Sequence, residues 1–241
     1  MTEMTSAQLV QQEWSQSGTS PTNNEQFNRD GYLVVKKLCD PTILFNPLPN
    51  EKGQYTWWGK RLDQFTYNET ENQVEGSLSR YNHPQYKKVH TDIRLKLEEI
   101  IGNKLYNTYY YDRYYFQGQE LKRHADRHSC EISVTVHIGT NIDEDWPIWI
   151  KTPDVYEDEN KTKLVSTGEN RSVILEPGDG MIYKGCERPH WRDPMPGSLI
   201  SALAQLNGNP MNELYYHQIF FHYVLQDGER AHFAWDHGIS L

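Results

Sequence analysis

The sequence has few cysteines. Cys39, Cys130 and Cys186 are the three in 241 residues, they are widely spaced, and none belongs to a CxxC pair. Disulfide frameworks use an even number of cysteines at characteristic spacings, and thiolate zinc sites are usually built from CxxC pairs. The sequence therefore predicts neither kind of site and favours a reducing, intracellular setting.

Basic residues and long apolar runs are also scarce. The chain has 24 Lys and Arg against 33 Asp and Glu, a formal net charge of -9. Because affinity for nucleic acids is built largely from Lys and Arg on phosphates, we expect a small-molecule or peptide substrate and no nucleic-acid partner. No apolar run approaches the length of about 20 residues that a membrane helix needs, and residues 1–26 lack the features of a signal peptide. We expect a soluble, cytoplasmic protein.

The composition divides the chain into a tail and one domain. Residues 1–26 are rich in Ser, Thr, Gln and Asn, too polar to pack, and we interpret them as a mobile tail with a short helix at residues 6–15. Residues 27–241 are expected to form a single domain, since β-rich barrels of this length commonly do. It should open with a turn at Phe27 to Gly31, a β-branched strand and a second turn at Asp40-Pro41.

Residues 84–101 have the apolar spacing of a helix, and Gly102 stands where a C-terminal cap belongs. Short alternating or apolar runs follow, separated by Gly, Pro, Asn and Asp turns. The strands expected from them are residues 106–116, 131–138, 148–151, 172–175, 181–183, 190–192 and 214–225. This order predicts a mainly β domain with flanking helices, an antiparallel barrel or jelly roll.

Two His-x-Asp pairs stand out, because non-haem Fe(II) oxygenases bind iron with two imidazoles and one carboxylate on one face of the metal. His90 and Asp92 lie in the expected helix, where residues two apart diverge, so we expect a solvated surface or a local hydrogen bond there. His124 and Asp126 lie between expected strands. At the end of a strand, side chains two apart point the same way and supply two ligands from one short stretch.

The surroundings of the second pair resemble a known family. Tyr115-x-x-Gly118 precedes His124 and an alternating strand follows it. A turn at Pro177-Gly178-Asp179 then leads through a short aromatic strand to His190. Together with the opening Phe27-Asn-Arg-Asp-Gly-Tyr, these motifs resemble 2-oxoglutarate-dependent Fe(II) oxygenases, particularly prolyl-4-hydroxylase-like and phytanoyl-hydroxylase-like proteins, over residues 27–225.

The resemblance implies a double-stranded β-helix, the cupin-like jelly roll. It further implies that His124, Asp126 and His190 bind Fe(II), with 2-oxoglutarate as cosubstrate and ascorbate as a candidate reductant of the iron. The implied reaction hydroxylates a C–H bond of a peptidyl residue, an amino acid or another small molecule and releases succinate and CO2. Tyr115 matches a tyrosine that contacts the cosubstrate in such relatives, although packing in a Tyr-rich strand explains it equally well.

One position departs from the family pattern. An Arg or Lys about ten residues after the second histidine usually holds the remote carboxylate of 2-oxoglutarate, but no Lys or Arg occurs between Arg192 and Arg230. Residues 196–212 are expected to be a loop insertion, with the final strand at residues 215–223. Arg192, two residues after His190, is the first candidate substitute, with an ion pair to Asp193 or Glu187 as the alternative. Lys151 is the second candidate.

Other interpretations stay open. A cupin-like jelly roll could use a metal or a bare pocket for isomerisation or hydrolysis without 2-oxoglutarate turnover, and a binding module without catalysis is the third alternative. Arg127 could orient Asp126, meet an acidic substrate or form a surface ion pair. Trp149, Tyr183 and Trp191 could line a substrate pocket or pack in the core. The histidines expected to be structural or exposed are His128, His137, His217, His222, His232 and His237.

Overall fold

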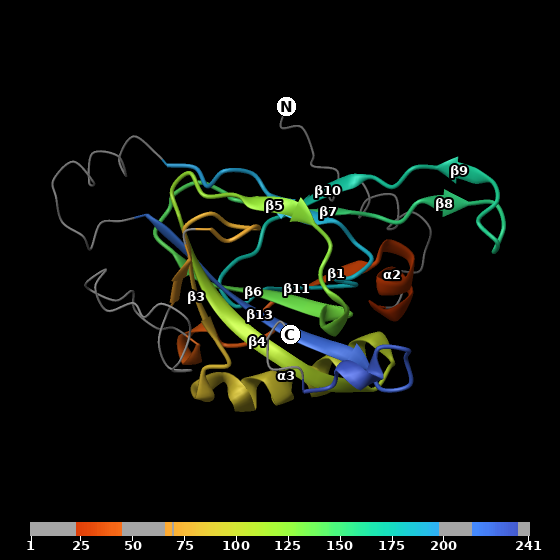
Figure 1. The fold of residues 1–241 in the computed structure, drawn as a ribbon, viewed down its shortest axis with the longest axis horizontal. Coiled ribbons are helices and arrows are strands. Elements are labelled where there is room, and N and C mark those ends of the chain that lie inside the picture. The colour runs from red at the N-terminus through yellow and green to blue at the C-terminus, as the bar shows by residue number, and fades with distance from the viewer. Residues whose placement is uncertain (1–22, 45–65, 69, 198–213, 236–241) are drawn as a thin grey trace, which may run out of the picture.

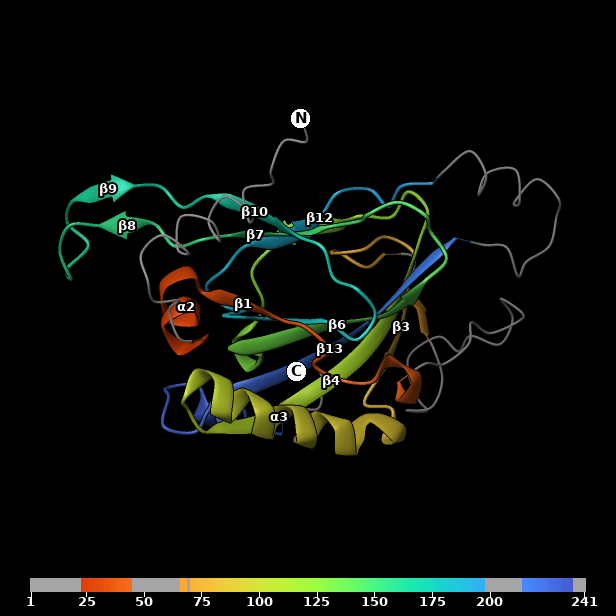
Figure 2. The same ribbon diagram turned by 180° about the vertical axis from the view of Figure 1, so that it is seen from behind.

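Two antiparallel β-sheets face each other in the structure, which is a computed structural model describing residues 23–44, 66–68, 70–197 and 214–235 (Figures 1 and 2). The larger sheet has the strand order β1-β11-β6-β13-β4-β3-β2. Its strands, in chain order, are β1 (Tyr32–Val35), β2 (Thr66–Asn68), β3 (Ser77–Tyr81), β4 (Leu105–Phe116), β6 (Ile132–Thr140), β11 (Gly180–Tyr183) and β13 (Tyr215–Leu225). The expected mainly β, jelly-roll class is confirmed.

The smaller sheet forms the opposite layer and has the order β10-β7-β12-β5. Its strands are β5 (Leu121–His124), β7 (Ile148–Lys151), β10 (Asn170–Val173) and β12 (His190–Arg192). A separate hairpin, β8 (Val155–Tyr156) and β9 (Leu164–Ser166), projects from the edge of this layer (Figure 1).

The expected helix is confirmed as a 3-10 turn (Pro84–Tyr86) that runs into α3 (Lys87–Ile101). Gly102 ends it with a φ of 71°, and its N–H donates to the carbonyl of Glu98. A left-handed residue at this position favours glycine, which has no Cβ to clash. Helix α3 lies across the outer face of the larger sheet (Figure 2). No helix in the described part of the chain is long and apolar enough to cross a membrane.

The turn expected at Phe27 to Gly31 is wrong, because these residues end a helix, α2 (Asn23–Asp30). Its polar sequence gives no helical signal, and tertiary contacts hold it: Phe27 is buried, and the Asn24 amide donates to the carbonyl of Ile101 at the end of α3. Strand β3 was not predicted either. The short helix expected at residues 6–15 lies outside the described residues, as does most of the expected insertion at 196–212.

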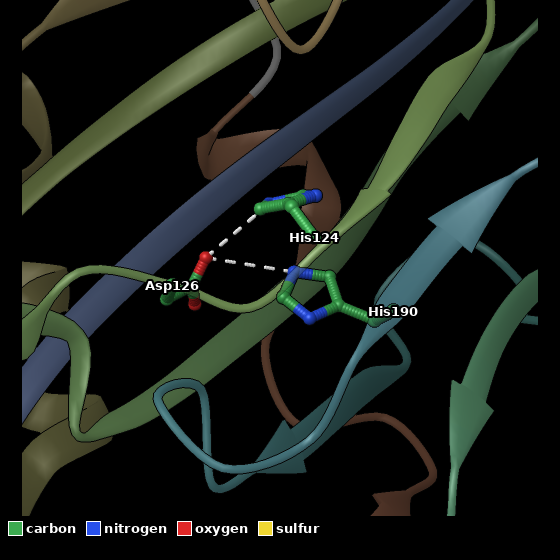
Figure 3. A group of neighbouring side chains, drawn as sticks. All are labelled: His124, Asp126 and His190. Carbon is green, nitrogen blue, oxygen red and sulfur yellow. Dashed lines mark ion pairs between the residues drawn. The ribbon is translucent and has the colours of Figure 1, made fainter.

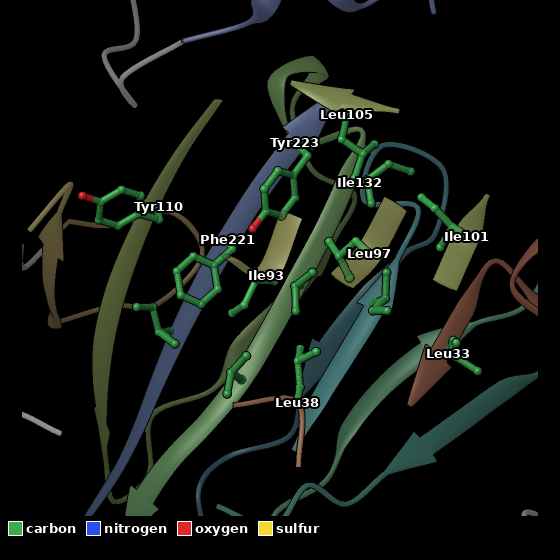
Figure 4. Close-up of a cluster of buried hydrophobic side chains, with 14 of the residues drawn as sticks. Leu33, Leu38, Ile93, Leu97, Ile101, Leu105, Tyr110, Ile132, Phe221 and Tyr223 are labelled. Atoms are coloured by element: carbon green, nitrogen blue, oxygen red, sulfur yellow. The ribbon is translucent and has the colours of Figure 1, made fainter. Parts of the chain in front are cut away.

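Strand alternation divides the buried side chains between the two faces of the larger sheet. Ile132, Val134 and Val136 of β6 point outward and pack with Ile93 and Leu97 of α3 in the largest hydrophobic cluster (Figure 4). Burying each such side chain contributes about 1.5–3 kcal/mol. The opposite face of the same strands, which meets the smaller sheet, carries Ser133, Thr135 and His137, all buried. Strand β6 therefore contributes polar side chains to the interior between the sheets.

His90 differs from the expectation of a solvated surface residue. It is buried between α3 and the sheet, its ring lies 4.8 Å from that of Tyr223, and its Nε2 is 3.0 Å from the carbonyl oxygen of His222. Asp92 is exposed and pairs with Lys88. The two side chains of this His-x-Asp pair do diverge, as residues two apart on a helix must.

Acid should destabilise the protein partly through His90. Burial lowers the pKa of His90 from 6.5 to about 3, so below pH 6.5 the unfolded chain binds a proton that the folded chain excludes. Stability is then complete above pH 6.5 and decreases as the pH falls toward 3, by about 1 kcal/mol per pH unit for this group. Urea unfolding at several pH values gives the free energy of unfolding as a function of pH. Between pH 6.5 and 3 this free energy should fall less steeply in His90→Leu than in the wild type. An equal pH dependence in both proteins would contradict the assignment.

Candidate metal centre

Strand pairing brings two histidines from distant parts of the sequence together. His124 is the last residue of β5 and His190 the first of β12, and the two are direct partners in the antiparallel register. Side chains of directly opposed residues lie on the same side of a sheet. Here both point toward the larger sheet, with ring centroids 4.3 Å apart (Figure 3). The convergence follows from the register and needs no special loop.

Asp126 completes the group from the loop that follows β5. Its Oδ1 is 3.5 Å from the Nε2 of His124 and 3.5 Å from the Nε2 of His190. One ligand atom from each of the three residues lies within 4.8 Å of the others. Ligands on neighbouring positions of a first-row metal, bound at about 2.1 Å, would be roughly 3 Å apart. A small contraction around an ion would bring these atoms to that spacing.

Both imidazoles are held in the orientation that metal binding requires. The Nδ1 of His124 is 2.8 Å from the carbonyl oxygen of Lys122, and the Nδ1 of His190 is 3.0 Å from that of Arg188. A carbonyl can only accept, so each Nδ1 carries the proton and donates it. Each Nε2 is left with its lone pair toward Asp126. Burial also lowers the pKa of His190, which favours the neutral form that binds metals.

The Asp126 carboxylate is fixed by its second oxygen and stays ionised. Ser133 Oγ on β6 donates to its Oδ2 at 2.8 Å, and His222 Nδ1 lies 3.0 Å from the same hydroxyl. Burial raises the pKa of Asp126, but its attraction to His190 and His124 in their protonated forms outweighs burial and lowers this pKa well below its usual value in the metal-free protein. An anionic carboxylate oriented by an outer hydrogen bond is what a metal ligand needs.

The absence of a side chain at Gly185 leaves space for the Asp126 carboxylate. A Cβ at this position would lie 2.5 Å from the Oδ2 of Asp126, 2.6 Å from the Oγ of Ser133 and 2.3 Å from the carbonyl oxygen of Cys130. Gly185 also accepts a hydrogen bond from the backbone N–H of Asp126. A side chain at residue 185 would therefore displace the loop or the carboxylate.

Gly185→Ala should lower both stability and metal affinity. Overpacking of this kind costs about 1–3 kcal/mol, because neither backbone nor carboxylate can yield without breaking a hydrogen bond. Gly139→Ala on β6 is the matched control, since a Cβ there meets nothing within 4 Å. Urea unfolding and iron titration of both variants test this. Equal behaviour of the two variants would mean that the loop at residue 185 is not fixed as described.

A second group of possible ligands shares Asp126 and adds Cys130 and His222. Burial raises the pKa of the Cys130 thiol well above its usual value, and a neutral thiol is a poor metal ligand. The Nδ1 of His222 is already engaged with Ser133. We therefore regard Ser133 and His222 as outer partners of Asp126 and favour the group of His124, Asp126 and His190.

Arg192 lies inside the barrel, two residues along β12 from His190. It is 1 % exposed, and its guanidinium is held between the rings of Trp146 and Tyr216, 4.5 and 4.6 Å from their centroids. It donates to the carbonyl of Trp146, to Tyr216 Oη and, at 3.1 Å, to Gln218 Oε1. The alternative of an ion pair with Asp193 or Glu187 is not found, and no described carboxylate pairs with it. Its Nε has no hydrogen-bond partner among the described residues.

Tyr115 lies near Arg192, and Lys151 does not. The Tyr115 ring packs at 5.1 Å against that of Trp146, and its buried hydroxyl has no partner in the described part of the chain. The expectation for Lys151 is wrong. Ile148 and Ile150 of β7 point inward, so Lys151 points outward, where it is partly exposed and pairs with Asp154 at 3.2 Å.

The sequence analysis missed Arg113, a second buried guanidinium in the interior. It lies on β4 and pairs across the sheet with Gln218, which in turn accepts from Arg192. The signal was available, because strand alternation places residue 113 on the same face as Tyr115. A charged residue on that face of a tyrosine-rich strand is conspicuous once the face is known to be interior.

The remaining expectations separate by face. Tyr183 lies inside, with its ring 4.7 Å from His190, whereas Trp149 and Trp191 stack on the outer face of the smaller sheet. Arg127 is exposed and lies over the ring of Tyr109 at 4.6 Å. The structure supports structural or exposed roles for the other histidines that it describes, namely His128, His137, His217, His222 and His232; His237 lies outside the described residues.

Comparison with known sequences finds no match to any family model and none to a curated protein. Comparison with solved structures finds many matches. A 2OG-Fe(II) oxygenase family oxidoreductase from Burkholderia pseudomallei is 7% identical, with a TM-score of 0.52 over 83% of this chain and 88% of that one. The non-haem α-ketoglutarate-dependent epimerase SnoN of nogalamycin biosynthesis is 10% identical, with a TM-score of 0.53 over 82% and 80%.

A prolyl hydroxylase from Trichoplax adhaerens, solved with a peptide fragment of a hypoxia-inducible factor, is 13% identical, with a TM-score of 0.50 over 95% of this chain and 96% of that one. The structural similarity establishes the architecture, but at identities this low it leaves the reaction open. The protein has the double-stranded β-helix fold of the solved 2-oxoglutarate-dependent Fe(II) oxygenases.

Proposed function

We propose that this protein is an Fe(II)- and 2-oxoglutarate-dependent oxygenase whose metal is held by His124, Asp126 and His190. The observation that carries the proposal is the convergence of two imidazole nitrogens and one carboxylate oxygen on one point. A hydrogen bond to another atom of the same side chain orients each of the three. Two imidazoles and one carboxylate on one side of a metal leave open positions for a cosubstrate and O2, as non-haem iron oxygenases require. The domain is proposed to be one catalytic unit that includes helix α2.

The proposed cosubstrate contacts are Arg192 and Tyr115. A buried guanidinium without a described carboxylate partner is costly in the free protein and favourable once an anion arrives. The free Nε of Arg192 and the free hydroxyl of Tyr115 are both donors inside the barrel. They supply hydrogen bonds that suit the remote carboxylate of 2-oxoglutarate, which the expected Lys or Arg on the last strand would otherwise bind.

Bound iron with 2-oxoglutarate would supply the oxidising chemistry, in which the cosubstrate is converted to succinate and CO2. The chain supplies the geometry. His124 and His190 would hold the metal through Nε2, Ser133 keeps Asp126 aligned, and Trp146 and Tyr216 hold the Arg192 plane. We propose hydroxylation of a C–H bond in a peptidyl residue, an amino acid or another small molecule as the outcome. Ascorbate is proposed as the auxiliary reductant.

Anaerobic titration separates this proposal from a cupin-like protein that does not use 2-oxoglutarate. Binding of 2-oxoglutarate should be tight when the protein is loaded with Fe(II) and much weaker without metal, because the keto-acid end needs the ion. Isothermal titration of both forms, without O2, measures this difference directly. Iron binding with no effect on 2-oxoglutarate affinity would reject the oxygenase and favour the cupin-like alternative.

A further inference from the structure

The guanidinium of Arg113 is not used by the proposed iron and cosubstrate chemistry. It is 1 % exposed, and its only ion pair in the described structure joins Nη2 to Glu71 Oε2 at 3.3 Å. Its Nε and Nη1 have no hydrogen-bond partner among the described residues. The Glu71 side chain is 20 % exposed, so it compensates a fully buried cation only from the rim.

A neighbouring arginine shows what a satisfied guanidinium looks like in the same sheet. Arg80 on β3 is also buried but faces the opposite side, where its Nε donates to Asp112 Oδ1 at 3.1 Å and its Nη2 to Asp112 Oδ2 at 2.7 Å. This two-point geometry is the usual way to bury an arginine. Arg113 has no such two-point partner, and its Nε–H and Nη1–H, which lie on different sides of the guanidinium, remain available to a ligand.

A row of tyrosines connects Arg113 with the candidate metal centre. The Tyr111 ring stacks on that of Tyr81 at 4.8 Å, and Tyr81 on Tyr109 at 6.2 Å. The Arg113 guanidinium lies 5.3 Å from the centroid of the Tyr111 ring, and this ring stacks on that of His222 at 5.8 Å. His222 contacts the Ser133 hydroxyl, which donates to the metal-ligand candidate Asp126. Tyr81 is 36 % exposed, so the row runs from the surface into the barrel.

We propose that the primary substrate is an organic carboxylate whose anionic group pairs with the Arg113 guanidinium at one of its two free N–H positions, Nε or Nη1. This inference rests on the proposed function, since it assigns the substrate class of that same site. The apolar or aromatic body of the substrate lies along Tyr81, Tyr109 and Tyr111, which leads it toward the metal ligands. A single negative charge fits, because Arg113 already shares its one positive charge with Glu71. The 2-oxoglutarate carboxylate is assigned to Arg192, which donates to Gln218, the strand partner of Arg113; the probe is therefore titrated with 2-oxoglutarate already bound.

A stability comparison tests whether Arg113 is a ligand site or a structural residue. Arg80→Met breaks a fully paired buried ion pair and should lower the melting temperature by about 10 °C. Arg113→Met removes a poorly compensated cation, and the partly exposed Glu71 can rehydrate. The melting temperature of the ligand-free protein should be unchanged or higher. A decrease as large as that of Arg80→Met would assign Arg113 to the framework and overturn the proposal.

Binding of a matched pair of probes tests the substrate class itself. Phenylacetate and phenylacetamide share an aromatic body and differ in charge. Each is titrated without O2 into iron-loaded protein saturated with 2-oxoglutarate, and affinity is measured by calorimetry. Phenylacetate should bind and phenylacetamide should bind at least about tenfold more weakly; Arg113→Gln should lose the same factor. Arg94→Gln, which alters a partly buried Arg–Glu pair on α3, is the control and should bind like the wild type.

The two proposals fail in different ways. Absence of metal-dependent 2-oxoglutarate binding would reject the oxygenase before any probe is added. Normal 2-oxoglutarate binding, with no phenylacetate binding or with equal affinity in the wild type and Arg113→Gln, would reject the carboxylate substrate and leave the oxygenase in place.

Discussion

His124→Ala should lose iron and, with it, all conversion of 2-oxoglutarate. Removing one imidazole leaves two protein ligands, Asp126 and His190, which are too few for the three-ligand arrangement that holds such iron. Loss of only an outer partner costs about 10–100-fold in metal affinity, so loss of a ligand should cost more than about 100-fold. Equilibrium titration with Fe(II) and succinate formation measure the two effects.

His128→Ala is the matched control for this substitution. His128 is four residues away and exposed, and its ring stacks on Phe233 outside the metal group. It should bind iron and turn over like the wild type. If His124→Ala and His128→Ala bound iron equally well, the metal would have to lie elsewhere, and the group of His124, Asp126 and His190 would lose its assignment.

Arg192→Gln should weaken 2-oxoglutarate binding about 10–100-fold, the value of one charge-assisted hydrogen bond. Arg192→Lys should not restore affinity, because the planar fork that lies between Trp146 and Tyr216 has no equivalent in an ammonium group. Calorimetric titration of the iron-loaded variants without O2 gives the affinities.

Lys151→Gln is the control for the loss of a positive charge. Lys151 is on the outward face of β7 and pairs with Asp154, so the affinity for 2-oxoglutarate should not change. A purely structural Arg192 would give a different pattern: Arg192→Gln would melt earlier than the wild type, yet bind 2-oxoglutarate with unchanged affinity. That pattern would remove Arg192 from the cosubstrate site.

The parts of the fold that sequence predicted well are those with strong local signals. Helix α3 combines apolar periodicity with a glycine cap, and the long strands β4, β6 and β13 are rich in β-branched and aromatic residues. Helix α2 was missed because its stability comes from contacts with distant residues, including Ile101, rather than from its own polar sequence. Local propensity is a weak prior when tertiary contacts decide.

The candidate site shows the same division. His124 and Asp126 are close in sequence, and His190 follows a recognisable turn, so the pattern identified all three as candidates. Their meeting depends on the β5–β12 register. Lys151 was named as the second candidate because strand alternation was not applied to β7, where Ile148 and Ile150 take the interior positions. Arg113 was overlooked because the sequence alone does not show which face of β4 is interior.

The central claim is tested most directly by succinate and CO2 formation from labelled 2-oxoglutarate when anaerobically iron-loaded protein is exposed to air. The account predicts slow turnover in the wild type even without a primary substrate, stoichiometric release of the two products, and no turnover in His124→Ala. Iron-loaded wild type that binds 2-oxoglutarate but forms the products no faster than His124→Ala, with phenylacetate present or absent, would contradict it.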